Sequence, residues 1–266
     1  MRYGSLQSGY SRLSRLQFAK PMDKIKKKIS TPPGLVAGFR RALLLLCVAC
    51  CATGQTIAQQ SLTPSDLAVR YPALAEVGSR SFTPKGAAGD PLNLAFIGGE
   101  DDLLRLMAKA GWFPADPITL RSSLRITVDS LARRPYVDAP VSSLYVHGRK
   151  QDLAFEQPAA NNPSKRHHVR FWRLDAPGRT QWIAAATYDT SIGFSHVNGH
   201  VTHHISPDVD AERDKLLADL ARAGGASISW VDGFQPVRDG RNGGGDPFHT
   251  DGRLAVVVIA PKAAAP

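Results

Sequence analysis

The side chains best suited to chemistry are concentrated between Tyr188 and Arg213. Four of the eight histidines lie in this stretch, together with several carboxylates and an arginine. Imidazoles, carboxylates and a guanidinium group close together can transfer protons, hold a divalent metal or bind an anionic group. The residues are His196, His200, His203, His204, Asp189, Asp208, Asp210, Glu212 and Arg213. The sequence therefore predicts a candidate site here, and the surrounding elements decide which of these side chains meet.

An Asn198-Gly199 pair divides this stretch and predicts a β-hairpin with a two-residue turn. Such a turn sets Gly193 opposite His204. Side chains alternate between the two faces of a strand, which assigns His196 and His203 to the apolar face, where we expect structural histidines. His204 lies on the other face, and Gly193 opposite it would leave room for a ligand.

His204 is therefore our preferred acid–base residue. Asp189 ends a strand expected over 181–189, and we expect its carboxylate to orient the imidazole. His200 shares the face of His204 and is predicted to bind substrate. These assignments depend on the hairpin register.

A strand expected over 167–173 carries a second polar group. Its alternation points His167 inward and sends His168 and Arg170 to the opposite face. If this strand lies near the hairpin, His168 and Arg170 meet His204 above one sheet surface. We predict a catalytic role for His168 and anion binding by Arg170. The alternative, that this surface is simply solvated, stays open.

A helix is expected over 208–223, starting at Ser206-Pro207. Arg213 lies on its apolar stripe, and a buried guanidinium group needs a partner. The partner is Asp189, another carboxylate or an anionic substrate, and in the last case Arg213 binds substrate. Asp208 stands in the first turn, where a carboxylate also complements the helix dipole.

A divalent metal is compatible with these residues but no motif requires one. His204 with Asp208 and Asp189 would make a histidine–carboxylate set suited to Zn²⁺ or Mn²⁺. The segment 239–252 is rich in glycine and carboxylates, but Arg241 stands where a calcium ligand is needed. We interpret that segment as a glycine-rich connection.

The remaining elements predict the fold class. Helices are expected over 100–110 and 117–134, and strands over 92–97, 144–147, 153–156, 167–173, 181–189, 227–231 and 254–259. Consecutive strands with helices before and after them favour a single α+β domain, with a largely antiparallel sheet flanked by about three helices. Residues 59–89 contain several prolines and glycines and are interpreted as a linker or N-terminal arm.

The first 58 residues have the pattern of an export signal. Basic residues over 24–28 and 40–41 precede an apolar run, 42–52, that is too short to span a bilayer. We expect cleavage before Gln59, and Met22 is an alternative start. All three cysteines, at positions 47, 50 and 51, lie in this segment, and Cys50 leaves lipoprotein anchoring open.

The net charge of +10 belongs to the same segment. Residues 1–58 hold 10 of the 33 lysines and arginines and 1 of the 23 acidic residues, so the rest carries 23 basic and 22 acidic side chains. This balance does not favour nucleic acid as a partner.

Several segments together resemble the C-terminal domain of LssY-type bacterial proteins. They are DPLNLAFIGGEDDLLRLMAKAGW, ITLRSSLRI, APVSSLYVHGRKQDLAFEQP, RHHVRFW, AATYDTSIGFS and THHISPDVDAERD, spanning about 90–261. In that family the domain often follows integral-membrane modules, and this chain is expected to carry an export signal in their place. The resemblance implies a periplasmic or cell-envelope setting near phospholipid chemistry, but no catalytic role.

Two functions fit these observations. One is a binding or accessory module linked to membrane or phospholipid processes, with a membrane lipid or an envelope membrane protein as partner. The other is a hydrolase acting on a phosphate- or acyl-bearing envelope substrate through His204, Asp189, Arg213 and Arg170. The sequence leaves open whether the chain is an enzyme, and it indicates no oligomeric state.

Overall fold

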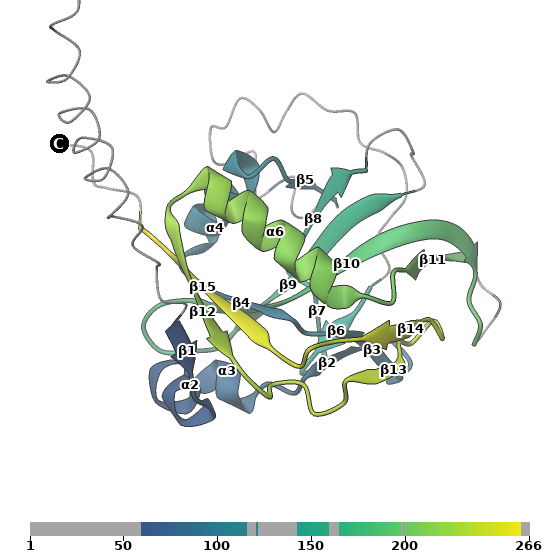
Figure 1. Ribbon diagram of the computed structural model, residues 1–266, viewed down its shortest axis with the longest axis horizontal. Coiled ribbons are helices and arrows are strands. Elements are labelled where there is room, and N and C mark those ends of the chain that lie inside the picture. Colours follow the sequence, from purple (N-terminus) through teal and green to yellow (C-terminus); the bar gives the residue numbers. More distant parts are fainter. Residues whose placement is uncertain are drawn as a thin grey trace, which may run out of the picture. The chain divides into compact units, whose positions relative to one another are not determined.

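The computed structural model describes residues 60–115, 121, 143–159, 165–197, 199 and 201–261. The predicted export signal and nearly all of the helix expected over 117–134 lie outside these residues. Residues 57–266 form one compact unit. Its described part is an α+β domain with largely antiparallel sheets, as predicted (Figure 1).

A nine-stranded sheet forms the centre of the domain. Its strands follow the order β1-β12-β15-β4-β10-β9-β8-β5, with β11 paired to the second half of β10. Only the β1–β12 and β15–β4 pairs are parallel among these described strands. The bounds are β1 (Gln60–Leu62), β4 (Leu94–Ile97), β5 (Phe113–Pro114), β8 (Leu153–Pro158), β9 (Arg166–Leu174), β10 (Gln181–Phe194), β11 (Val201–Ile205), β12 (Ala226–Val231) and β15 (Leu254–Ile259).

Two helices cover one face of this sheet. They are α4 (Glu100–Lys109) and α6 (Val209–Ala223) (Figure 1). Their buried leucines pack with Phe96, Trp182 and other sheet residues in one hydrophobic cluster. Asp208 caps α6, because its carboxylate accepts a hydrogen bond of 3.0 Å from the Ala211 N–H, and this satisfies one of the free amides of the first turn.

The opposite face of the sheet is covered by a second layer. It contains α2 (Pro64–Arg70), α3 (Pro72–Glu76) and a small sheet of β2 (Arg80–Phe82), β3 (Ala88–Pro91), β6 (Tyr145–Val146) and β7 (Arg149–Lys150). Side chains of this layer pack on Trp172 and Ile183. Residues 60–89, which belong to the segment predicted as a linker or N-terminal arm, are therefore built into the domain as β1, α2, α3, β2 and the start of β3. The described residues contain four helices. None of the helices in the described ranges is long and apolar enough to cross a bilayer.

The hairpin register differs from the prediction. Gly193 pairs with Thr202, and Phe194 pairs with Val201, so the loop between β10 and β11 is longer than a two-residue turn. The shift of two residues keeps the alternation of side chains but moves each histidine along the strand. A two-stranded ribbon of β13 (Asp239–Arg241) and β14 (Pro247–His249) follows α6 and β12 in the chain.

Candidate functional site

A cavity of about 550 Å³ lies where β9, β10 and β11 meet the loops 83–89 and 242–244. β10 extends beyond the end of β4. From Asp189 onward, β11 pairs with the edge of β10 that β4 leaves free. The covering layer thus leaves a hollow at this end of the sheet. The polar side chains lining it are Thr83, Lys85, Asp90, Ser143, Arg166, His168, Arg170, Asp189, Ser195, Thr202, His203 and Asn242.

Asp189 is the centre of an ion network at the cavity. The antiparallel register sets Arg166 opposite Asp189, and Arg166 Nε donates to Asp189 Oδ2 at 2.9 Å. Arg166 Nη1 also donates to Glu156 Oε2 at 3.1 Å. Burial raises the pKa of the Asp189 carboxyl, but His168 and Arg166 outweigh it and hold that pKa well below its usual range. Asp189 is therefore ionised at neutral pH.

His168 is a buried, neutral imidazole that is hydrogen-bonded through Nε2. Its Nε2 lies 2.7 Å from Arg170 Nη1 and 2.8 Å from Thr187 Oγ1. A guanidinium group can only donate, so Nε2 accepts and the proton sits on Nδ1, which is 3.1 Å from Asp189 Oδ1. Burial lowers the pKa of His168 and the Arg170 charge adds to this, more than Asp189 raises it. His168 thus connects Arg170 to Asp189.

Arg170 is the second buried guanidinium group of the cavity. Its Nη1 donates to Asp90 Oδ2 at 3.2 Å, and Asn242 Nδ2 donates to Asp90 Oδ1 at 3.1 Å. Strand β9, β3 and the loop after β13 are joined in this way. Both arginines are under 10% exposed and both line the cavity, which is an unusual environment for charged groups and requires partners.

His203 is the half-buried imidazole of the network. Its Nδ1 lies 3.3 Å from Asp189 Oδ2, and its Nε2 lies 3.4 Å from Arg166 Nη2. Burial lowers the pKa of His203 and the Arg166 charge lowers it further, against a raising effect of Asp189. The result is a neutral imidazole in the cavity lining, with the Asp189 carboxylate beside one ring nitrogen and the Arg166 guanidinium group beside the other.

The structure brings together three of the residues predicted from the sequence, namely His168, Arg170 and Asp189. His204 lies elsewhere, because its Nδ1 is 2.7 Å from Asp246 Oδ1. The space above Gly193 is taken by that imidazole, since a Cβ there would be 2.6 Å from His204 Nε2. His200 lies outside the described residues. Asp208, proposed as a metal ligand with His204, serves instead as the cap of α6.

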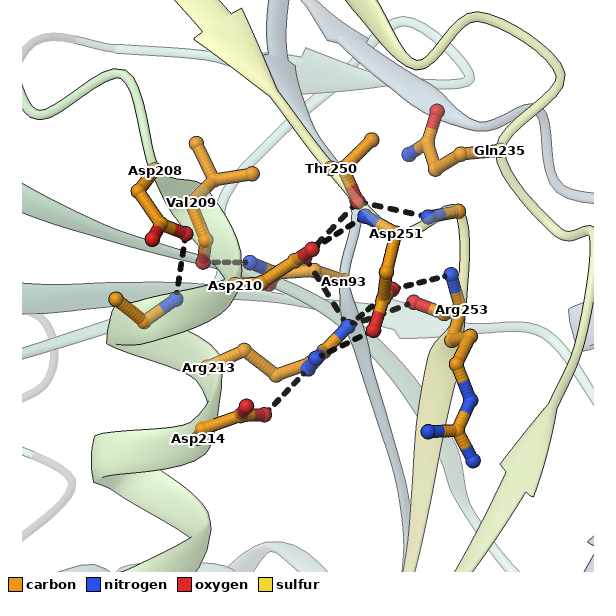
Figure 2. Close-up of polar contacts among 12 residues, drawn as sticks. Asn93, Asp208, Val209, Asp210, Arg213, Asp214, Gln235, Thr250, Asp251 and Arg253 are labelled. Atoms are coloured by element: carbon orange, nitrogen blue, oxygen red, sulfur yellow. Dashed lines mark hydrogen bonds and ion pairs between the residues drawn. The ribbon is translucent and has the colours of Figure 1, made fainter.

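Arg213 belongs to a separate salt-bridge network (Figure 2). Its Nη1 donates to Asp251 Oδ1 at 2.8 Å and to Asp210 Oδ1 at 3.1 Å, and its Nε donates to Asp214 Oδ1 at 2.8 Å. The guanidinium carbon also lies 4.7 Å from the centre of the Trp230 ring. Three carboxylates satisfy Arg213 without a substrate, and Arg213 does not line the cavity.

Arg166 was not selected from the sequence, and His203 was named there but interpreted as a structural histidine. Arg166 precedes the strand expected over 167–173, yet β9 starts at Arg166 and pairs it with Asp189. Extending that strand by one residue would have indicated the contact. His203 was assigned to an apolar face expected to lie in the core, but Ile192 and Phe194 on that face are exposed.

A family model described as LssY C-terminus matches residues 74–254, more than half of the chain. The chain belongs to the LssY C-terminus family. The predicted resemblance is thereby confirmed, and the match begins earlier than expected, in α3 of the covering layer. No curated protein and no solved structure matches the chain. All residues lining the cavity fall inside the part that matches the LssY C-terminus family.

Proposed function

We propose that this LssY C-terminal domain binds a small anionic amphiphile in the cavity. The observation that carries the proposal is the burial of two guanidinium groups, Arg166 and Arg170, in the lining of one hollow. Guanidinium groups recognise phosphate and carboxylate groups by paired hydrogen bonds. A partly desolvated guanidinium group attracts an anion more strongly than a surface lysine does.

The rest of the lining suits a ligand that is only partly polar. Leu144, Val197 and Ile205 contribute apolar surface beside the charged groups. The volume of about 550 Å³ is within the range of small-molecule sites. Lys85 is exposed at the loop that borders the cavity, where a positive charge would attract an anion during entry.

The shifted pKa values of the cavity support a functional role for it. The pKa of Asp189 is lowered, as are those of His168 and His203. Burial also raises the pKa of Glu156, the ion-pair partner of the cavity residue Arg166, by more than Arg166 lowers it. Groups with perturbed pKa values gather at functional sites more often than elsewhere.

A direct test titrates the full chain with dodecyl phosphate and, separately, with the neutral dodecyl maltoside, using isothermal calorimetry. We expect Arg170→Gln to weaken dodecyl phosphate binding by about 10- to 100-fold, the loss for a hydrogen bond to a charged group. Lys85→Gln should weaken it a few-fold without disturbing the fold, because Lys85 is exposed. Lys109→Gln, on the far helix α4, is the matched control and should bind normally.

The proposal fails if dodecyl phosphate does not bind, or if Lys85→Gln and Arg170→Gln both bind it as the wild type does. Equal affinity for the neutral amphiphile would also contradict recognition of the anionic group. The thermal stability of each variant is measured first, so that an affinity loss from unfolding is recognised.

His203 favours a second function, hydrolysis of a phosphate or acyl ester. In this reaction His203 would take a proton from a water molecule, which attacks the ester, and the alcohol would leave with that proton. Arg166 would stabilise the developing negative charge, and Asp189 would stabilise the imidazolium. Turnover of p-nitrophenyl phosphate or p-nitrophenyl butyrate that is lost in His203→Gln would favour the hydrolase. Binding of dodecyl phosphate without turnover of either ester would favour the binding module.

We also propose that the domain acts in the periplasm or cell envelope, with a membrane lipid or an envelope membrane protein as its partner. The export pattern of residues 1–58 supports this setting. N-terminal sequencing of the protein from fractionated cells tests the proposal. A new terminus at Gln59 in the periplasm, or lipidated Cys50 in the membrane fraction, agrees with it, and an uncleaved cytoplasmic chain contradicts it.

A further inference from the structure

A second cluster of ligand-type side chains lies beside the cavity and takes no part in the proposed function. It consists of His196 in the loop after β10, His204 on β11 and Asp246 in the loop between β13 and β14. One nitrogen or oxygen atom from each residue lies within 4.8 Å of the other two. His204 Nδ1 is 2.7 Å and His196 Nε2 is 3.6 Å from Asp246 Oδ1.

The charge of Asp246 is not matched by an ordinary cation. Its side chain is 5% exposed, and among the described residues no lysine or arginine pairs with it. A buried carboxylate is costly unless a positive charge balances it. A divalent metal bound by Asp246 and two neutral imidazoles would supply that charge.

Hydrogen bonds on the side away from the imidazoles hold Asp246 in place, as they hold a preformed metal ligand. Its Oδ2 accepts the Ile205 N–H at 3.2 Å. Its own N–H donates to Asn242 Oδ1 at 3.0 Å, and its carbonyl oxygen accepts the Asn242 N–H at 2.9 Å. These bonds leave Oδ1 facing the imidazoles, and such supporting contacts orient ligands in metal sites.

Two glycines allow the imidazoles to reach this position. A Cβ at Gly193 would lie 2.6 Å from His204 Nε2. Gly245 has a φ of +89°, and a Cβ there would lie 2.7 Å from the Cβ of His196. Any other residue at Gly193 would displace the His204 ring, and at Gly245 it would also be strained.

We propose that His196, His204 and Asp246 bind a divalent transition metal of the Zn²⁺ class. Two imidazoles and one carboxylate are a ligand set that Zn²⁺ accepts, with bonds of roughly 2.0–2.2 Å. Ligand atoms around such an ion lie about 3.3 Å apart. The 3.6 Å contact is close to this value, and the 2.7 Å contact widens when the metal replaces the proton on His204. Three protein ligands leave one position for water or another ligand.

The metal would fasten two loops that form one wall of the cavity. The His196 N–H already donates to the Gly244 carbonyl oxygen at 3.0 Å, and Ser195 Oγ donates to the same oxygen at 3.3 Å. Ser195 and Gly244 both line the cavity. Metal binding thus joins the β10–β11 loop to the loop after β13, and it is expected to stabilise the cavity wall.

Zinc binding to the full chain tests this proposal without any assay of activity. Cys47, Cys50 and Cys51 are replaced by serine in every protein, so that thiolates outside the site cannot bind the metal. The protein is dialysed against Zn²⁺ and analysed for bound metal, and its Co²⁺ form is examined for the visible absorption of a tetrahedral site. We expect one equivalent of Zn²⁺ and a higher unfolding temperature with Zn²⁺ than with a chelator.

The decisive comparison is between His196→Ala and His249→Ala. Both side chains are more than half exposed, so neither change disturbs the fold. His196→Ala should weaken Zn²⁺ binding by at least about 10-fold, as loss of a supporting or direct ligand does, and His249→Ala should bind normally. Failure of the wild type to bind Zn²⁺, or equal affinity in His196→Ala, overturns the proposal. Dodecyl phosphate binding is measured separately, so that the two proposals fail independently.

Discussion

Arg166 and Asp189 face each other across the antiparallel pair β9–β10, with Arg166 Nε 2.9 Å from Asp189 Oδ2. Asp189 is fully buried and is approached by His168 and His203 as well. This pair therefore fixes the positions of the two imidazoles relative to the cavity. It also makes the free energy of unfolding sensitive to any change that leaves one partner unpaired.

Asp189→Asn is expected to lower the free energy of unfolding by about 3–5 kcal/mol, because it leaves the buried Arg166 charge without its main partner. Urea denaturation of the full chain measures this loss. Asp102→Asn is the control, since its ion pair with Arg105 is at the surface of α4 and such pairs contribute about 1 kcal/mol or less. Equal losses in the two variants would contradict the assigned role of Asp189.

The stability of the domain should fall as the pH is lowered below about 6.5, the ordinary pKa of histidine. The pKa of His168 is lowered in the folded state, so the unfolded state takes up a proton first. The contribution of His168 to the free energy of unfolding is fully present above the pKa that this histidine has in the unfolded chain. It is lost as the pH falls through the lower pKa of the folded state. The slope reaches at most about 1.4 kcal/mol per pH unit for one group.

His168→Gln should make this pH dependence shallower between about pH 7.5 and about pH 5.5, although the variant is less stable throughout. His203 contributes in the same direction, because its pKa is lowered too. His249→Gln, an exposed histidine, should keep the slope of the wild type. Urea midpoints at each pH give both slopes, and an unchanged slope in His168→Gln would show that another group causes the effect.

Arg213→Met is expected to destabilise the domain by about 3–5 kcal/mol while leaving dodecyl phosphate binding unchanged. Its guanidinium group is 2% exposed and holds three carboxylates (Figure 2), but it does not line the cavity. Asp214→Asn removes the most exposed of these carboxylates and should cost about 1 kcal/mol or less. Calorimetry under native conditions would contradict this assignment if Arg213→Met lost binding while still folded.

Asn93→Ala tests how the start of α6 is joined to β10. Asn93 Nδ2 donates to the carbonyl oxygens of Ala186 and Val209, each at 3.1 Å, and its Oδ1 accepts the Ala186 N–H at 3.0 Å. The substitution leaves buried backbone groups unpaired and should cost about 1–3 kcal/mol. Hydrogen exchange of the Ala186 amide should increase, and unchanged protection there would refute this role.

Local patterns in the sequence predicted the fold class and part of the site. Alternation in the strand over 167–173 placed His168 and Arg170 on one face, opposite His167, and the structure has them so. The same pattern could not show that a second layer, made of α2, α3 and the small sheet of β2, β3, β6 and β7, covers that face. Such packing joins segments far apart in the chain. The solvated surface left open from the sequence is in fact buried.

The hairpin shows where local reasoning failed. Asn198-Gly199 predicts a two-residue turn, but the Ser195 carbonyl oxygen accepts the Gly199 N–H at 3.0 Å, and the loop is longer. Contacts between this loop and Gly244, distant in the sequence, compete with the local preference. An irregularity in the β10–β11 pairing between Asp189 and Ser191 also sets Asp189 opposite Ile205, and this places His203, rather than His204, beside Asp189.

The most direct test of the cavity as a binding site is the NMR spectrum of the histidine side chains during titration with dodecyl phosphate. The imidazole resonances of His203 are assigned by their absence in His203→Gln. The account predicts that they shift in proportion to saturation, while those of His249 stay in place. Saturable binding that leaves His203 unshifted, or that shifts His249 instead, would contradict a ligand site between Arg166, Arg170 and His203.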